Sequence, residues 1–154
     1  MESQYLKDKF ENIANTVAKA KTVDNLELAS MLSNYLICFI SGTYEDCIEY
    51  LFIQRAKRSN DKELISLVEE LIAAHFRDPT YEKIRNLVRL LNPLSATLLD
   101  SKIDIRDKEG INSISRNRNE IVHYGRNPNV TINDVVDFHN RTLKIFEELE
   151  RMLL

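Results

Sequence analysis

Glycine, proline, cysteine and tryptophan are scarce in this chain of 154 residues, which has three Gly, three Pro, two Cys and no Trp. So few turn-forming residues argue against a sandwich or barrel built from many short strands. Cys38 and Cys47 lie in an apolar stretch, without Cys-x-x-Cys spacing and without a histidine nearby. We therefore expect two reduced core cysteines and no metal site.

Long apolar runs and a strong excess of one charge are also missing. The chain is 44% hydrophobic and 29% charged, which is typical of a globular protein and excludes a disordered one. No run of about 18 apolar residues is present and the N-terminal MESQYLKDKF is polar, so we expect no membrane segment, no signal peptide and a cytoplasmic location. A net charge of −3 excludes a general polyanion binder, so any contact with nucleic acid requires a local basic patch.

Apolar residues recur at helical spacing along most of the chain. This periodicity predicts helices over about residues 4–20, 26–57, 64–72, 81–91, 112–124 and 132–152. The mixed and charged segment from 93 to 110 is expected to be a loop with one helical turn. The sequence thus predicts one all-α domain over residues 1–154, an antiparallel bundle of about five to six helices.

The segment RNRNEIVHYG, residues 116–125, places polar side chains on a helix that also has an apolar row. The inward-facing positions of this row are Ile111, Ile114, Ile121 and Val122. Arg118 lies in the same row, whereas Asn119 and His123 belong to a second stripe. Gly125 suits the left-handed position that ends a helix. Residues 116–126 contain three arginines and one acidic residue, so this segment is locally cationic within an acidic chain.

A structural role explains the arginine and the histidines without any reaction. An arginine in an apolar row often extends its charged head to water, or pairs with a carboxylate such as that of Glu45. His123, in the last turn, can interact with the negative end of the helix dipole. His139 lies on the apolar row of the last predicted helix and is expected to be a core or interface residue. Spacing alone favours this structural role for all of them.

The segment RNEIVHYG resembles the signature of the HEPN superfamily, an Arg-x(4–6)-His motif on small helical domains with a polar residue directly after the arginine. Arg118, Asn119 and His123 match its Arg-Asn-x-x-x-His form. GTYEDCIEYL, residues 42–51, is similar to the central helix of the RiboL-PSP-HEPN branch, in which an acidic residue such as Glu45 follows a small residue. PTYEKIRNLVRLLNP, residues 79–93, resembles the short helix that this branch places before its motif helix.

The resemblance implies a homodimeric, metal-independent endoribonuclease whose two motif helices face each other across a cleft. Arg118, Asn119 and His123 would be its catalytic residues, acting when the 2′-hydroxyl of single-stranded RNA attacks the adjacent phosphate. An imidazole moves protons near neutral pH, and a guanidinium offsets charge on the phosphate. No cofactor is expected. Two chains would double the arginines in one cleft, which explains how an acidic protein holds RNA.

Arg116, Tyr124 and Arg126 are further candidates for RNA contact, the arginines through phosphates and Tyr124 by stacking on a base. The resemblance also implies a toxin or effector of a bacterial defence or toxin–antitoxin system, with an antitoxin or other partner protein. Two alternatives stay open. One is a non-catalytic HEPN-like dimerisation module that binds a nucleotide or a partner protein, and the other is an unrelated helical adaptor in which Arg118 neutralises Glu45.

Overall fold

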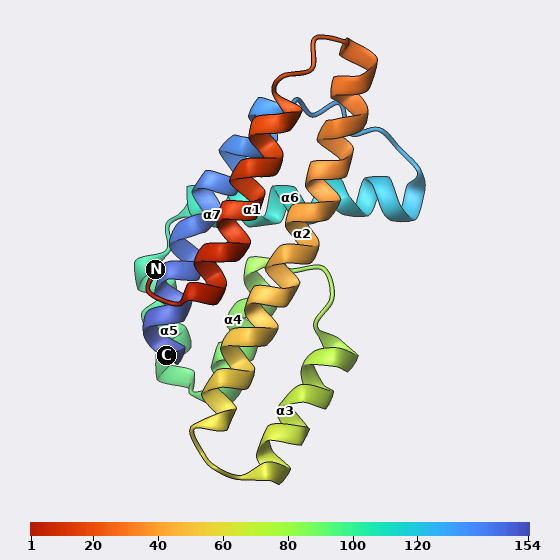
Figure 1. The fold of residues 1–154 in the computed structure, drawn as a ribbon. Coiled ribbons are helices and arrows are strands. Elements are labelled where there is room, and N and C mark those ends of the chain that lie inside the picture. The colour runs from red at the N-terminus through yellow and green to blue at the C-terminus, as the bar shows by residue number, and fades with distance from the viewer.

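The computed structural model describes residues 1–154 apart from the side chain of His75. Seven helices, and no strand over the described residues, make up the chain (Figure 1). They are α1 (Gln4–Ala20), α2 (Leu26–Lys57), α3 (Lys62–His75), α4 (Tyr81–Leu91), α5 (Pro93–Lys102), α6 (Ile105–Tyr124) and α7 (Ile132–Leu153). The all-α class is therefore confirmed, with one helix more than expected.

Capping residues mark the start of α2 and the end of α6, and the second of these was predicted from Gly125. Asn25 caps α2 by accepting a hydrogen bond from the Leu28 N–H at 2.9 Å. Gly125 ends α6 in the left-handed region, at a φ of 60°. A capping residue acts on backbone groups within its own end of the helix. Such signals are local, so they can be recognised without knowledge of the tertiary structure.

The segment from 93 to 110 was wrongly expected to be a loop. Pro93 begins α5 instead of only ending α4, because Asn92 accepts from the Leu94 N–H at 2.9 Å and a proline fits the first helical position. Asp104 and Asp107 then form a reciprocal capping box. This box starts α6 at Ile105, seven residues before the start predicted for the motif helix.

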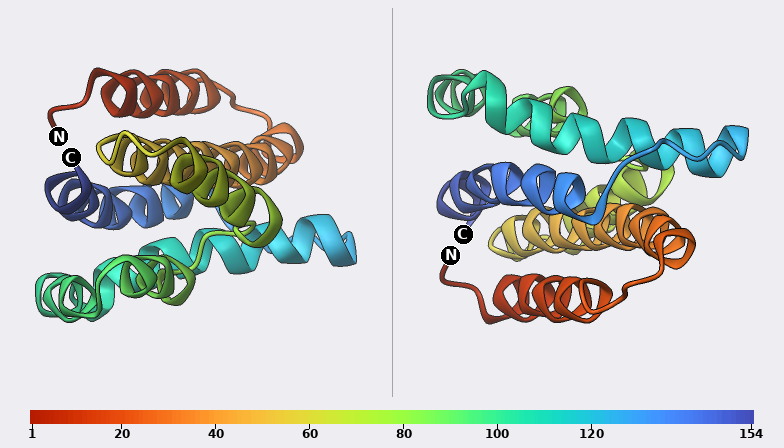
Figure 2. Two further views of the ribbon diagram at one scale, coloured as in Figure 1. Left: turned by 90° about the horizontal axis from the view of Figure 1, so that it is seen from below. Right: turned by 90° about the horizontal axis from the view of Figure 1, so that it is seen from above.

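The helix α2, of 32 residues, is the centre of the bundle. It packs against α1, α3, α6 and α7, and its buried side chains line the core from Leu36 to Phe52. Seen from either end in Figure 2, α1 covers one side of the layer formed by α2 and α7, and α4, α5 and α6 cover the other. In both views the C-terminal end of α6 projects beyond the rest of the bundle.

The crossing of α6 over α7 depends on Gly110. A Cβ atom at this position would lie 2.7 Å from the Phe138 carbonyl oxygen and 2.8 Å from the Arg141 Cβ in α7. Both distances are shorter than nonbonded atoms tolerate. Gly110, predicted to end a loop, is instead a buried residue of α6. Its missing side chain lets the two helix backbones approach each other.

Gly110→Ala is expected to lower the free energy of unfolding by about 1–3 kcal/mol, because the added methyl group must displace the α7 backbone. Gly42→Ala is the matched control in α2. A Cβ at Gly42 meets no atom within 4 Å, so this change is expected to stabilise the chain by about 0.5–1 kcal/mol through helix propensity. Urea unfolding of both variants measures the two effects, and the same sign for both would contradict the crossing as described.

His139 is a core residue, as expected. Its ring is buried beside Phe10, and its Nδ1 lies 2.8 Å from the hydroxyl of Tyr44. Burial lowers the pKa of His139 to about 4, so the ring is neutral in the folded chain near neutral pH. The histidine of α7 therefore belongs to the packing of the bundle and lies outside the predicted site.

The buried imidazole of His139 predicts a loss of stability in mild acid. The unfolded chain takes up a proton at this ring below about pH 6.5, but the folded chain does so only below about pH 4. The free energy of unfolding contributed by His139 therefore falls as the pH drops through this window, by on the order of 3 kcal/mol. His139→Gln does not titrate and keeps an acceptor for Tyr44, so the stability of wild type relative to this variant should fall between about pH 7 and about pH 4.5 in urea unfolding. A constant difference between the two would show that the ring is not held neutral.

Candidate active site

The motif residues occupy the last two turns of α6, on the part of this helix that projects from the bundle (Figure 2). Ile111 and Ile114, earlier in the helix, are fully buried, and Ile121 is half-buried. Val122 was predicted to face inward, but it is 52% exposed. The prediction was wrong because the helix runs past its neighbours there, so the apolar row continues without a covering helix from the same chain.

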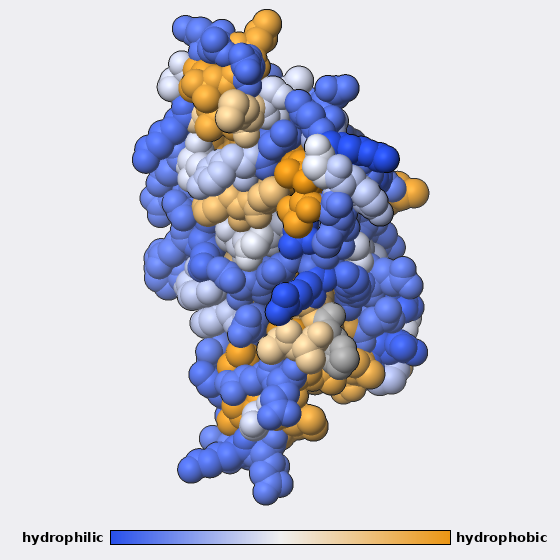
Figure 3. Space-filling model, turned by 90° about the vertical axis from the view of Figure 1, so that its right-hand side faces the viewer, coloured by the Kyte–Doolittle hydropathy of each residue, from blue (hydrophilic) through white to orange (hydrophobic). Residues whose placement is uncertain are grey.

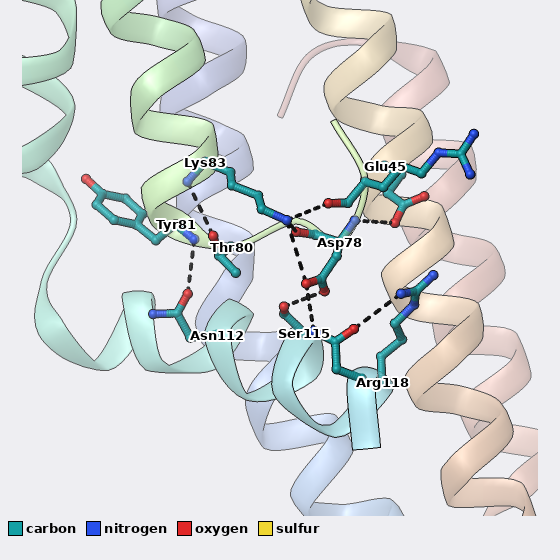
Figure 4. Close-up of polar contacts among 10 residues, drawn as sticks. Glu45, Asp78, Thr80, Tyr81, Lys83, Asn112, Ser115 and Arg118 are labelled. Carbon is teal, nitrogen blue, oxygen red and sulfur yellow. Dashed lines mark hydrogen bonds and ion pairs between the residues drawn. The ribbon is translucent and has the colours of Figure 1, made fainter. Parts of the chain in front are cut away.

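Arg118 and Glu45 lie near each other but do not form the predicted ion pair. Among the described side chains, the hydrogen-bond partner of the Arg118 Nη1 is the Asn119 Oδ1, at 3.3 Å. The Glu45 carboxylate accepts instead from the backbone N–H of Asp78, at 2.8 Å. Figure 4 shows the reason. Asp78, in the loop between α3 and α4, lies beside Glu45, and its backbone N–H binds the Glu45 carboxylate. A direct pair is thus replaced by a chain of hydrogen bonds.

Asp78 joins the loop to the motif helix and is a residue that the sequence analysis missed. Its Oδ1 accepts from the Ser115 hydroxyl at 2.5 Å (Figure 4), and its Oδ2 accepts from the Asn119 Nδ2 at 2.7 Å. The Lys83 Nζ lies 3.7 Å from the same Oδ2. The φ of Asp78 is 64°, a left-handed conformation that aspartate adopts more readily than most residues.

Asn119 does not hold the ring of His123 in this structure. Its amide nitrogen donates to Asp78 and its oxygen accepts from Arg118, so both of its polar ends are used within this network. The His123 side chain is exposed and forms no hydrogen bond with any described residue. The imidazole is therefore free to exchange protons with solvent or with a bound molecule.

The three candidates for RNA contact lie at the surface, and the two arginines among them form exposed ion pairs. Arg116 is 3.6 Å from Glu109, and Arg126 is 3.3 Å from Glu120. The Arg126 guanidinium also lies over the ring of Tyr124, 5.2 Å from its centroid. Exposed pairs of this kind contribute little to stability, so a polyanion can displace the carboxylates at small cost. Tyr124 and Arg126 thus contact each other and follow His123 closely in the sequence. Arg116 is instead paired with Glu109, earlier in α6.

The face of α2 beside Arg118 is apolar and open. Burial raises the pKa of the Cys38 thiol, and the nearby charge of Arg118 opposes this shift. One turn and two turns above Cys38, Tyr35 is 54% exposed and Met31 is 64% exposed. We call Leu28, Met31 and Tyr35 the α2 apolar stripe. Figure 3 looks onto the right-hand side of Figure 1, where hydrophobic side chains interrupt the hydrophilic surface at the upper end, near the middle and in the lower part.

No group of three or more His, Cys, Asp or Glu side chains among the described residues is arranged to hold a metal ion. No helix in the described chain combines the length and the apolar character needed to cross a bilayer. Comparison of the chain with family models, with curated proteins and with solved structures gave no match.

Proposed function

We propose that the chain is a metal-independent endoribonuclease of the HEPN type that cleaves single-stranded RNA. The observation behind this proposal is the state of Arg118, whose hydrogen-bond partner is a neutral amide and which forms no ion pair with a described carboxylate. An arginine in the predicted structural pair would be neutralised by Glu45, which is close by but engaged by Asp78. The guanidinium therefore remains available to bind an anion.

Two side chains, His123 and Arg118, take part in the proposed reaction. A base removes the proton of the RNA 2′-hydroxyl, whose oxygen attacks the adjacent phosphorus, and the bond to the 5′-oxygen breaks after that oxygen gains a proton. His123 is the group that transfers protons, since its ring is exposed and an imidazole can act as a general acid or base. Arg118 binds the phosphate oxygens as their negative charge grows. The products are a 2′,3′-cyclic phosphate and a free 5′-hydroxyl.

The active form is proposed to be a homodimer in which two motifs line one groove. The α2 apolar stripe, together with Val122 and Tyr124 at the end of α6, consists of exposed hydrophobic residues. Burying them against the same residues of a second copy would follow two-fold symmetry and would bring two Arg118 side chains together. The proposed setting is the bacterial cytoplasm, as a toxin or effector restrained by an antitoxin or partner protein. That setting rests on the sequence resemblance.

The direct test is cleavage of a labelled single-stranded RNA by the wild-type chain in the presence of EDTA. Cleavage is expected without metal, with cyclic phosphate ends, and single-stranded DNA of the same sequence should stay intact because it lacks the attacking hydroxyl. No cleavage, or cleavage that EDTA abolishes, would contradict the proposal. A dimer without cleavage would favour the alternative, a non-catalytic module that binds a nucleotide or partner protein.

A further inference from the structure

We propose that Asp78 is a positioning residue of this site, which fixes the Asn119 amide so that its oxygen faces Arg118. This inference rests on the proposed function for its role in cleavage. The contacts that support it come from two elements distant in the sequence, the loop between α3 and α4 and the last turns of α6 (Figure 4). Asp78 itself does not reach the reacting groups and acts through Asn119.

The chemistry of the two neighbours leaves one orientation for the Asn119 amide. A carboxylate only accepts hydrogen bonds, so Asp78 selects the NH₂ group of Asn119, at 2.7 Å. A guanidinium only donates, so Arg118 requires the oxygen, at 3.3 Å. Both requirements are met at once. The amide dipole is therefore oriented with its positive end toward Asp78 and its negative end toward Arg118. Arg118 is held in place without losing its charge to a carboxylate.

Asp78 is itself held from several sides. Its backbone N–H donates to Glu45 at 2.8 Å, and its backbone carbonyl accepts from the Lys83 Nζ at 3.0 Å. Ser115 donates to the other carboxylate oxygen, and the Asp78 side chain is only 17% exposed. A backbone at positive φ persists where its surroundings fix it, and these contacts do so. The loop therefore presents a carboxylate of defined position to the motif helix.

The first experiment removes the carboxylate without straining the loop. Asp78→Gly fits a φ of 64°, because glycine adopts the left-handed region freely. Asn60→Gly is the matched control, since Asn60 also has a positive φ, of 56°, in the turn between α2 and α3. For Asp78→Gly we expect kcat for RNA cleavage to fall about 100-fold with KM changed less than about threefold, since a loosely placed charge fails mainly in the transition state. Asn60→Gly should cleave as the wild type does.

The second experiment exchanges donor and acceptor. Asn119→Asp alone sets two carboxylates against each other and should lower kcat about 100-fold. Asp78→Asn together with Asn119→Asp restores the pairing, because the new amide donates to the new carboxylate, which accepts from Arg118. The double variant should therefore unfold at a higher urea concentration than Asn119→Asp alone, although the carboxylate now on Arg118 should keep cleavage slow. An equal loss of stability with and without the change at 78 would overturn the inference.

A measurement without RNA separates this inference from the proposed function. In the wild type the side-chain NH₂ protons of Asn119 should give two well-separated NMR signals that exchange slowly with water, and in Asp78→Gly these should move to the values of a free amide. Unchanged signals, or full activity of Asp78→Gly beside an active wild type, would refute the positioning role alone. An inactive wild type whose Asn119 signals respond to Asp78→Gly would instead refute the nuclease and keep the positioning role.

Discussion

His123→Ala is expected to lower the rate of RNA cleavage by about 10²–10⁴-fold, the usual contribution of a general acid or base. The side chain is exposed and makes no hydrogen bond with the described residues, so its removal should leave the helices and their packing unchanged. Arg118→Ala is expected to lose about 10²–10³-fold by removing a charge that stabilises the transition state. Initial rates on labelled RNA and a circular-dichroism melt of each variant provide the measurement.

The matched control for His123→Ala is His139→Gln. Both remove a histidine, but His139 is buried in the core against Tyr44 and Phe10, away from the motif. Near neutral pH this control should cleave RNA at the wild-type rate while its stability in acid changes. Arg118→Lys adds a second comparison, because lysine keeps the charge but loses the planar fork that binds two phosphate oxygens. Full activity of His123→Ala would remove histidine from the reaction.

Met31→Glu combined with Tyr35→Glu is expected to convert the protein to a monomer and to abolish RNA cleavage. In a two-fold interface each substituted residue meets its own copy or a close neighbour of it, so the four added carboxylates would repel one another and be costly to bury. Both side chains are more than half exposed within one chain, so folding of the single chain should be unaffected. Light scattering gives the mass and the RNA assay gives the activity.

A control for this double variant is Leu94→Glu. Leu94 is another exposed hydrophobic residue, 79% exposed at the start of α5 and outside the α2 apolar stripe. It should leave both mass and cleavage unchanged. A wild-type chain that is monomeric and active, or a Met31/Tyr35 variant that stays dimeric, would show that the groove does not form at this face.

The long helices could be predicted from sequence because their signals are local and repeated. The bounds of α1 and α2 follow from apolar spacing over many turns and, for α2, from a cap at Asn25. The helix α5 was missed because Asn92-Pro93 is both an end signal for one helix and a start signal for the next, and its apolar pattern is weak. The role of Gly110 depends on how closely α7 approaches it, which no neighbouring residue reveals.

The motif of the candidate site was visible in the sequence, but its connections were not. Arg118, Asn119 and His123 lie within six consecutive residues, so their placement on one helix end follows from the helix alone. Asp78 precedes Asn119 by 41 residues and reaches it only through a left-handed turn. The predicted pair of Arg118 with Glu45 failed for the same reason, because the carboxylate was already bound by a loop whose path could not be inferred.

The last turn of α6 has consequences for control. Gly110 ties this helix to α7, and Ser115 and Asn119 tie it to Asp78, but Val122, His123 and Tyr124 extend beyond these attachments into solvent. In the homodimer proposed above, each imidazole comes near the Arg118 of the other copy only when two chains associate. The cleavage rate per chain should then rise with protein concentration.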